Sequence, residues 1–158
     1  MEKSNEPVLF YECELYPCSN FSSFEVVWNG ETWKTSEYAY QAAKFEDKKI
    51  KDIIKSARSS HDTKKLTHMY KDKKRKDWYD VKLAVMEDIL RAKLSQHFYV
   101  QKKLLQTGDR EIIENSHRDA YWGWGPEKDG ENNLGKIWMK LRQELQSGKI
   151  PLLKEDYK

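Results

Sequence analysis

Two stretches of the sequence carry polar side chains of the kinds that do chemistry. The first, Thr35–Phe45, reads TSEYAYQAAKF and sets the carboxylate of Glu37 among tyrosines and a glutamine. The second, His117–Gly125, reads HRDAYWGWG and places Asp119 ahead of aromatic residues separated by glycines. Glycine lets a backbone approach a ligand closely, and aromatic rings offer flat faces for a base. Both carboxylates are therefore candidates for acid–base or electrostatic catalysis.

A third feature, Gly130–Lys136, reads GENNLGK and places Asn132 and Asn133 just before a predicted helix. The first N–H groups of a helix have no partner within it, and they form a favourable site for an anion such as phosphate. The segment therefore predicts a phosphate site near the aromatic stretch.

Each of these features also has a purely structural explanation. Glu37 could complement a helix dipole, an effect of about 0.3–1 kcal/mol. Asp119 could cap a turn, and Trp122 could belong to the core. We favour a functional interpretation because two carboxylates, an aromatic glycine loop and an asparagine pair occur together.

The composition narrows the class of protein. The chain has 158 residues, 35% of them charged and 13% aromatic, and this length predicts one domain with its own core. The N-terminal stretch MEKSNEPVLF lacks the basic start and long apolar run of a signal peptide, and no apolar run is long enough to cross a bilayer. We therefore expect a cytoplasmic protein without a membrane partner.

The residues that most often bind metals form no ligand pattern. Cys13 and Cys18 are the only cysteines, and one C-x4-C pair without nearby histidines is a poor zinc site. No metal-ligand spacing relates the four histidines, His61, His68, His97 and His117. We expect no metal and no cofactor.

The positive charge is concentrated in one part of the chain. Residues 44–76 contain 13 Lys or Arg and 5 Asp or Glu, a balance of +8 within a net charge of +3, which leaves −5 for the rest. Two explanations stay open: a solvated helical face, or a surface that attracts phosphates or nucleic acid.

The strand signals are short. The strongest is Asn29-Gly30 between two apolar runs, because both positions of a tight hairpin turn take positive φ. The predicted strands are Val8–Glu12, Phe24–Trp28, Glu31–Lys34 and Glu111–Asn115.

Helical signals cover more of the chain. Thr35 or Ser36 can cap a first helix on which Tyr38, Ala42 and Phe45 share one face. Further helices are predicted at Lys48–Ala57, Asp62–Tyr70, Asp77–Leu94, Phe98–Gln106 and Leu134–Leu145, with an ordered loop at His117–Asn133. The pattern predicts a mainly helical α+β domain with a small antiparallel sheet.

Several motifs follow one another in a set order. They are W-x-x-S-E-Y-A-Y-Q-A-x-K-F (Trp33–Phe45), W-x-x-x-K-x-x-V-M (Trp78–Met86), L-x-x-T-G (Leu104–Gly108), I-x-E-x-S-x-x-D-x-Y-W-G-x-G (Ile112–Gly125) and N-x-L-G-K-I-x-M-x-L-R (Asn132–Arg142), preceded by Ser19–Phe21. This series resembles the YbiA-like, or NADAR, family of N-glycosidases over roughly residues 8–145.

The resemblance implies a YbiA-like α+β fold and hydrolysis of N-glycosidic bonds. It places the domain at 8–148, with tails at 1–7 and 149–158. The implied substrates are phosphorylated ribosylamino-pyrimidine intermediates of riboflavin biosynthesis, or ADP-ribose attached to guanine in DNA or other nucleic acid. Trp124 and the charged segment Pro126–Glu131 depart from the family pattern, and we expect them to affect substrate choice.

Applied residue by residue, the resemblance assigns roles in breaking a ribosyl C–N bond. Glu37 and Asp119 would be catalytic, stabilising a cation-like sugar or activating water, and which of them meets the water stays open. Trp78 and Trp122 would stack on the base, and Lys44, Lys82 or Asn133 would hold a phosphate. The full set predicted to bind substrate is Asn20, Tyr38, Gln41, Lys44, Trp78, Lys82, Tyr121, Trp122, Gly123 and Asn133.

Two other function classes compete with an N-glycosidase. A non-catalytic module that binds NAD or ADP-ribose would keep the aromatic loop and phosphate site without needing Glu37. A nucleic-acid-binding module without a pocket would use the basic segment alone. The presence of both carboxylates favours the enzyme.

Overall fold

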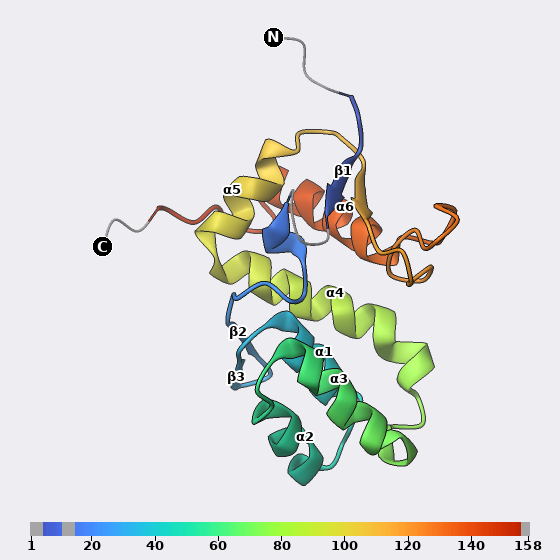
Figure 1. Ribbon diagram of the computed structural model, residues 1–158. Helices are drawn as coiled ribbons and strands as arrows, with labels where there is room; N and C mark the ends of the chain where they lie inside the picture. The colour runs from blue at the N-terminus through green and yellow to red at the C-terminus, as the bar shows by residue number, and fades with distance from the viewer. Residues whose placement is uncertain (1–4, 11–14, 156–158) are drawn as a thin grey trace. The chain divides into compact units, whose positions relative to one another are not determined.

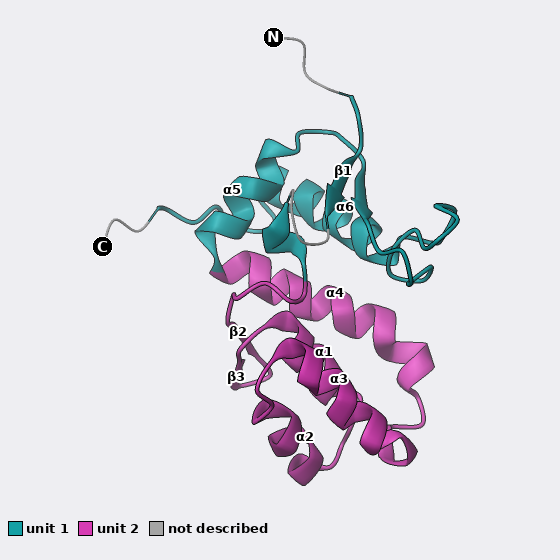
Figure 2. Cartoon of the chain, in the orientation of Figure 1, with its two compact units in different colours: residues 1–19, 97–158 teal, residues 20–96 magenta. Residues whose placement is uncertain are grey.

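The computed structural model describes residues 5–10 and 15–155. The chain forms two compact units, shown in different colours in Figure 2. Unit 1 comprises Met1–Ser19 and His97–Lys158, and unit 2 comprises Asn20–Gln96.

Unit 2 is a helical cluster with one hairpin (Figure 1). Helix α1 packs against α2, α3 and α4, so its side chains are covered from several directions. In chain order the elements are β2 (Val26–Trp28), β3 (Glu31–Trp33), α1 (Ser36–Ala43), α2 (Lys48–Lys55), α3 (Ser60–Met69), the 3-10 helix η2 (Lys71–Lys73) and α4 (Trp78–Gln96).

The hairpin β2–β3 is antiparallel, with Val26 opposite Trp33. Its turn has φ of 51° at Asn29 and 77° at Gly30, which confirms the predicted Asn-Gly turn. The side chain of Gln96, the last residue of α4, accepts from Val27 N and donates to Val27 O, both at 2.8 Å. The hairpin is thereby held to α4.

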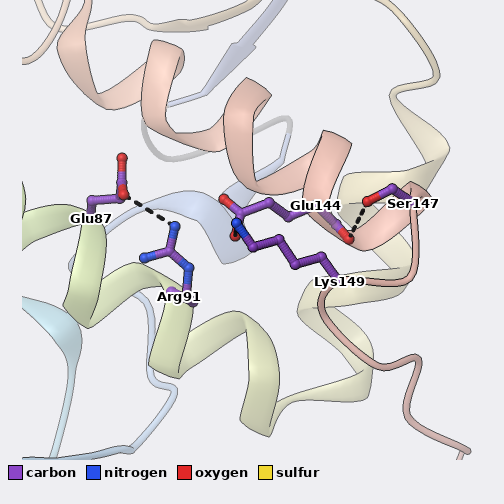
Figure 3. A network of polar contacts seen from close by, with 5 residues as sticks. All are labelled: Glu87, Arg91, Glu144, Ser147 and Lys149. Atoms are coloured by element: carbon purple, nitrogen blue, oxygen red, sulfur yellow. Dashed lines mark hydrogen bonds and ion pairs between the residues drawn. The ribbon is translucent and has the colours of Figure 1, made fainter.

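Side-chain caps begin the shorter helices of unit 2. Asp47 accepts a hydrogen bond from Lys49 N at the start of α2, and Ser59 accepts from Asp62 N at the start of α3. On the long helix α4, Arg91 donates to Glu87 one turn earlier at 3.1 Å (Figure 3). Capping and such i,i+4 pairs stabilise helices with exposed charged faces.

Unit 1 pairs two strands that are far apart in sequence. Strand β1 (Val8–Phe10) runs parallel to β4 (Ile112–Glu114), and α6 (Asn133–Gln146) packs on β4. The 3-10 helix η1 (Tyr16–Cys18) and α5 (Phe98–Gln106) complete the unit.

Buried polar contacts join these elements of unit 1. Trp138 of α6 donates to the carbonyl of Cys18 at 3.1 Å, and Arg142 donates to Thr107 Oγ1 at 2.8 Å. At the end of α6, Glu144 lies 4.0 Å from the ammonium of Lys149, and its carbonyl accepts from Ser147 Oγ (Figure 3).

The predicted mainly helical α+β fold with a small antiparallel sheet is confirmed. The parallel pair β1–β4 and the two 3-10 helices were not predicted, since a pairing across about a hundred residues leaves no local signal. Of the strand predicted at Val8–Glu12, the part up to Phe10 is observed, and Tyr11, Glu12 and Cys13 lie outside the described residues.

Candidate active site

Helix α1 presents a stripe of polar and aromatic side chains that is buried. Glu37, Tyr40, Gln41 and Lys44 are spaced at i, i+3, i+4 and i+7, so they share one face of the helix and its C-cap. Every residue of α1 is buried, with Glu37 only 4% and Gln41 only 3% exposed. Burying a carboxylate and an amide is costly, and groups placed in this way often serve a site.

The start of α1 is fixed by its neighbours in unit 2. Thr35 caps the helix, and its hydroxyl also lies 2.8 Å from the Ser60 hydroxyl of α3. The carbonyl of Asn20 accepts from Glu37 N at 3.1 Å, and its side-chain oxygen accepts from Ser36 Oγ at 3.0 Å. Asn20, predicted to bind substrate, therefore positions the first turn that carries Glu37.

The carboxylate of Glu37 accepts one strong hydrogen bond. Gln41 Nε2 donates to Glu37 Oε1 at 2.7 Å. Burial raises the pKa of Glu37 above 4.5, opposed by the Gln41 hydrogen bond and the positive charges of Lys64, Lys44 and then His61. The carboxyl group therefore keeps its proton up to a higher pH than an exposed glutamate does, and it can exchange that proton closer to neutral pH.

The amide of Gln41 has an unused acceptor. Its nitrogen is bound to Glu37, while Oε1 is buried and has no hydrogen-bond partner among the described residues. Buried polar atoms are nearly always paired, so an exception beside a buried carboxylate points to a ligand or water as its partner.

Lys44 is surrounded by aromatic rings and by other lysines. Its ammonium lies 5.2 Å from the centre of the Tyr40 ring and 5.9 Å from that of Trp78. Burial first, and the positive charge of Lys74 next, lower the pKa of Lys44 to about 8, although Glu37 acts in the opposite direction. Lys44 therefore changes charge close to physiological pH.

Trp78 begins α4 and packs against Tyr40, with ring centres 5.2 Å apart. It is 2% exposed, so little of its ring is open to a base. The stacking role predicted for Trp78 stays a prediction, and Tyr40 is a neighbour that the sequence reasoning missed.

The other predicted residues of unit 2 have partners of their own. Tyr38 donates its hydroxyl to the carbonyl of Ala57 at 2.7 Å, which ties α1 to the end of α2. The ammonium of Lys82 lies 5.2 Å from the centre of the Tyr79 ring. Their roles in binding also stay predictions.

In unit 1, Asp119 organises the aromatic loop. Its Oδ1 accepts from the backbone N–H groups of Tyr121 at 2.9 Å and Trp122 at 2.8 Å. One oxygen of Asp119 therefore caps the turn, as the structural explanation expects. A catalytic role for Asp119 stays a prediction. The rings of Tyr121 and Trp122 meet edge to face at 4.8 Å.

Carbonyl groups of the same loop accept hydrogen bonds from the start of α6. The N–H groups of Asn133 and Leu134 donate to the carbonyls of Tyr121 at 3.1 Å and Trp122 at 3.0 Å. These two N–H groups are therefore not available to an anion, and the phosphate role predicted for Asn133 stays a prediction. The side chain of Asn133 donates to Glu131 at 3.1 Å.

Asn132 and Gly123 fix the loop against β4. The side chain of Asn132 accepts from Glu114 N and donates to Ile112 O, both at 2.9 Å, so it continues the ladder of the strand. A Cβ at Gly123 would lie 2.6 Å from the carbonyl oxygen of Glu114. Only glycine fits there, because the loop backbone packs closely against β4. The substrate contact predicted for Gly123 stays a prediction.

The predicted site residues thus form two groups, one within each unit. Unit 2 brings together Glu37, Gln41, Lys44 and Trp78, and unit 1 brings together Asp119, Tyr121, Trp122, Gly123 and Asn133. His61 and Lys64 of α3, which act on the Glu37 charge, were missed, because helix packing and not local sequence places them near it.

Two further features concern metals and membranes. Within residues 5–10 and 15–155 no group of three His, Cys, Asp or Glu side chains is placed to hold a metal ion. In the same part of the chain no helix has the length and apolar character needed to cross a bilayer.

Comparison with known proteins finds one matching family. The family model described as NADAR domain matches residues 9–146. The domain bounds predicted from sequence, 8–148, stay a prediction.

The similar proteins are bacterial and plant proteins with two kinds of name. "N-glycosidase YbiA" of Escherichia coli is 38% identical over 127 residues, covering 80% of this chain and 79% of that protein. "N-glycosidase Npun_R5314" of Nostoc punctiforme is 34% identical, covering 89% and 93%. "Riboflavin biosynthesis protein VVA0006" of Vibrio vulnificus is 38% identical over 89% of this chain, which spans only 39% of that protein.

A solved structure agrees in fold. The NMR structure of the E. coli protein YbiA superposes with a TM-score of 0.84 at 32% identity, covering 99% of this chain and 94% of that one.

Proposed function

Because the chain belongs to the NADAR domain family, we propose that it hydrolyses the bond between a ribose and a nitrogen base, with Glu37 as the central carboxylate. The chain is an enzyme of the N-glycosidase class, a hydrolase of N-glycosyl bonds, as the names of relatives at 38% identity indicate. The observation that carries the role of Glu37 is that its carboxylate is buried and accepts a hydrogen bond from Gln41 Nε2 at 2.7 Å.

The proposed reaction exchanges a C–N bond for a C–O bond. The C–N bond breaks and its electron pair leaves with the base, while a water oxygen bonds to the anomeric carbon. Glu37 takes a proton from this water, the leaving base takes up a proton from solvent, and Glu37 then returns its proton to solvent. A carboxylate about 4 Å from the cationic carbon contributes on the order of 4 kcal/mol at an intermediate dielectric, about a thousandfold in rate.

Gln41 supports this role of Glu37 from one helical turn away. Its Nε2 holds the carboxylate in place, and its unpaired Oε1 is an acceptor for a hydrogen of the attacking water or of the sugar. The raised pKa of Glu37, caused by burial, makes its carboxylate a better base near neutral pH than an exposed one.

Lys44 is the cation that we assign to a substrate phosphate. Its ammonium lies beside the paired rings of Tyr40 and Trp78, and Lys64, Lys74 and Lys82 add positive charge near it. A bound phosphate would offset this repulsion and would raise the lowered pKa of Lys44.

Asp119 is proposed as the second carboxylate of the reaction, with Tyr121 and Trp122 as stacking groups for the base. One oxygen of Asp119 is used by the backbone of the loop, so this proposal concerns its charge and its other oxygen.

Two substrate classes follow from this proposal. A phosphorylated ribosylamino-pyrimidine is supported by the name of the Vibrio vulnificus relative. ADP-ribose on guanine in nucleic acid is supported by the +8 balance of residues 44–76. A non-catalytic NAD or ADP-ribose reader is less well supported, because it gains nothing from the cost of burying Glu37.

A product assay tests the proposed function. The purified chain is incubated with a ribosylamino-pyrimidine phosphate and, separately, with DNA carrying ADP-ribosylated guanine, and the free base and free sugar are separated by chromatography. We expect release from at least one of them. Tight binding of ADP-ribose without release from either would favour the reader instead.

A further inference from the structure

Tyr79 is an exposed aromatic ring flanked by two lysines. It lies at the start of α4, next to Trp78, and is 73% exposed. The ammonium groups of Lys82 and Lys74 lie 5.2 Å and 5.6 Å from the centre of its ring. These lysines come from α4 and from the end of η2, so two separate elements converge on one ring.

The same lysines extend the charge of the candidate site outward. Lys74, Lys64 and Lys82 all act on Lys44 and lower its pKa, so four ammonium groups face one region of unit 2. Among the described residues Lys64 and Lys74 form no ion pair. Of the acidic residues close to Tyr79 in sequence, Asp77 is held by Arg75 at 2.6 Å, which leaves Asp80 as the opposing charge.

We propose that Tyr79, with Lys74 and Lys82, is a platform for single-stranded nucleic acid, on which one unpaired base stacks while the lysines contact the adjoining phosphates. Such a base displaces one ammonium from the ring face, and that ammonium then reaches a phosphate. Alternation of an aromatic face with cations is the usual chemistry of single-strand binding.

The position of the platform favours a strand over a free small substrate. Glu37 and Gln41 are buried, whereas the Tyr79 ring is 73% exposed, so a compact substrate held at Glu37 does not need it. A strand that presents one nucleotide to the Glu37 site has neighbouring nucleotides to place outside. The platform extends the proposed function. It rests on that function only for the modified nucleotide that the strand would present to Glu37.

Equilibrium binding tests the platform independently of hydrolysis. Fluorescence anisotropy is measured with an unmodified, labelled single-stranded oligonucleotide of about ten nucleotides. Tyr79→Ala should weaken binding by about tenfold or more, whereas Tyr79→Phe, which keeps the stacking face, should stay within about twofold of wild type. Lys74→Gln should weaken binding and flatten its salt dependence by about one counterion.

Tyr99 supplies a matched control. It is 49% exposed on α5, and the ammonium of Lys103 lies 5.5 Å from its ring centre. Tyr99→Ala should bind the oligonucleotide like wild type. Equal losses for Tyr99→Ala and Tyr79→Ala, no loss for Tyr79→Ala, or equal competition by polyglutamate of the same charge would overturn the platform. Hydrolysis of a small riboside by wild type separates such a failure from a failure of the proposed function.

Discussion

At the scale of single residues, the polar stripe of α1 explains why Glu37 differs from an ordinary helix-start carboxylate. A charge that merely complements the helix dipole can stay in water. Glu37 is instead 4% exposed, bound to Gln41, and faced by positive charges from α1 and α3. Such an arrangement costs stability, and the role that we propose for Glu37 in the reaction would account for that cost.

The stability of Glu37→Gln should show this cost. Burial raises the pKa of Glu37 above 4.5, so between pH 4.5 and the raised pKa the folded protein binds more protons than the unfolded chain. The stability contributed by this group therefore falls as pH rises through that window. We expect Glu37→Gln to match wild type near pH 4.5 and to be more stable than wild type near neutral pH. Urea unfolding at both pH values measures it, and a variant less stable than wild type at neutral pH would contradict it.

Lys44 should govern the upper limb of the pH–rate profile. If its ammonium holds a substrate phosphate, kcat/KM falls as pH rises through about 8, because the free enzyme loses that charge. Lys44→Arg stays charged and should move this fall to higher pH. A kcat/KM that does not fall above pH 8, or a fall that Lys44→Arg leaves in place, would contradict the phosphate role.

At the scale of elements, two substitutions of Asp119, in the loop before α6, distinguish its structural role from its proposed catalytic role. Asp119→Asn keeps an oxygen that accepts from Tyr121 N and Trp122 N, whereas Asp119→Ala leaves both N–H groups without it. We expect Asp119→Ala to lose about 1–2 kcal/mol of stability and Asp119→Asn much less. If the charge is catalytic, Asp119→Asn should still lose turnover by about a hundredfold. A stable Asp119→Asn variant with wild-type turnover would leave Asp119 as a structural residue.

Gly123 should be sensitive to substitution. A Cβ there would meet the Glu114 carbonyl at 2.6 Å, so Gly123→Ala should cost about 1–3 kcal/mol as the loop shifts from β4. Gly108→Ala is the control, since its Cβ meets nothing within 4 Å and only the positive φ is strained. Chemical denaturation compares the free energies of unfolding of the two variants. Equal losses would contradict the expectation, because the clash at Gly123 would then cost no more than the φ strain at Gly108.

Local signals predicted most of these elements, and tertiary contacts account for what they missed. The Asn29-Gly30 turn and the Thr35 cap depend on neighbouring residues, so a sequence pattern reveals them. The i, i+3, i+4, i+7 spacing of the polar stripe was also present in the sequence beside the core face. By contrast, the loop carbonyls that bind the first N–H groups of α6, and the effect of Lys64 on Glu37, depend on packing between separate segments.

At the scale of the whole molecule, the concentrated positive charge and the proposed base Glu37 both lie in unit 2. Residues 44–76, with their +8 balance, lie entirely within it, as do Glu37, Gln41 and Lys44. A positive surface around a buried carboxylate suits the proposed reaction, because it would attract a phosphorylated substrate while the carboxylate faces the cationic carbon.

Hydrolysis should not depend on a divalent metal. The proposed reaction uses carboxylates where other hydrolases use a Lewis acid, and the described residues offer no cluster of three metal-ligating side chains. Dialysis against a strong chelator should leave the rate unchanged. A rate lost on dialysis and restored by magnesium or zinc would contradict this expectation.

The most direct test of the whole account is single-turnover hydrolysis by wild type and Glu37→Gln with enzyme in excess over substrate. The substrate is whichever N-riboside the wild type cleaves in the product assay, and Glu46→Gln, an exposed carboxylate shortly after α1, is the control. We predict that Glu37→Gln lowers the rate by about a hundredfold or more while ADP-ribose binding survives, and that Glu46→Gln leaves both the rate and the binding as in wild type. A Glu37→Gln variant that hydrolyses at the wild-type rate would contradict it.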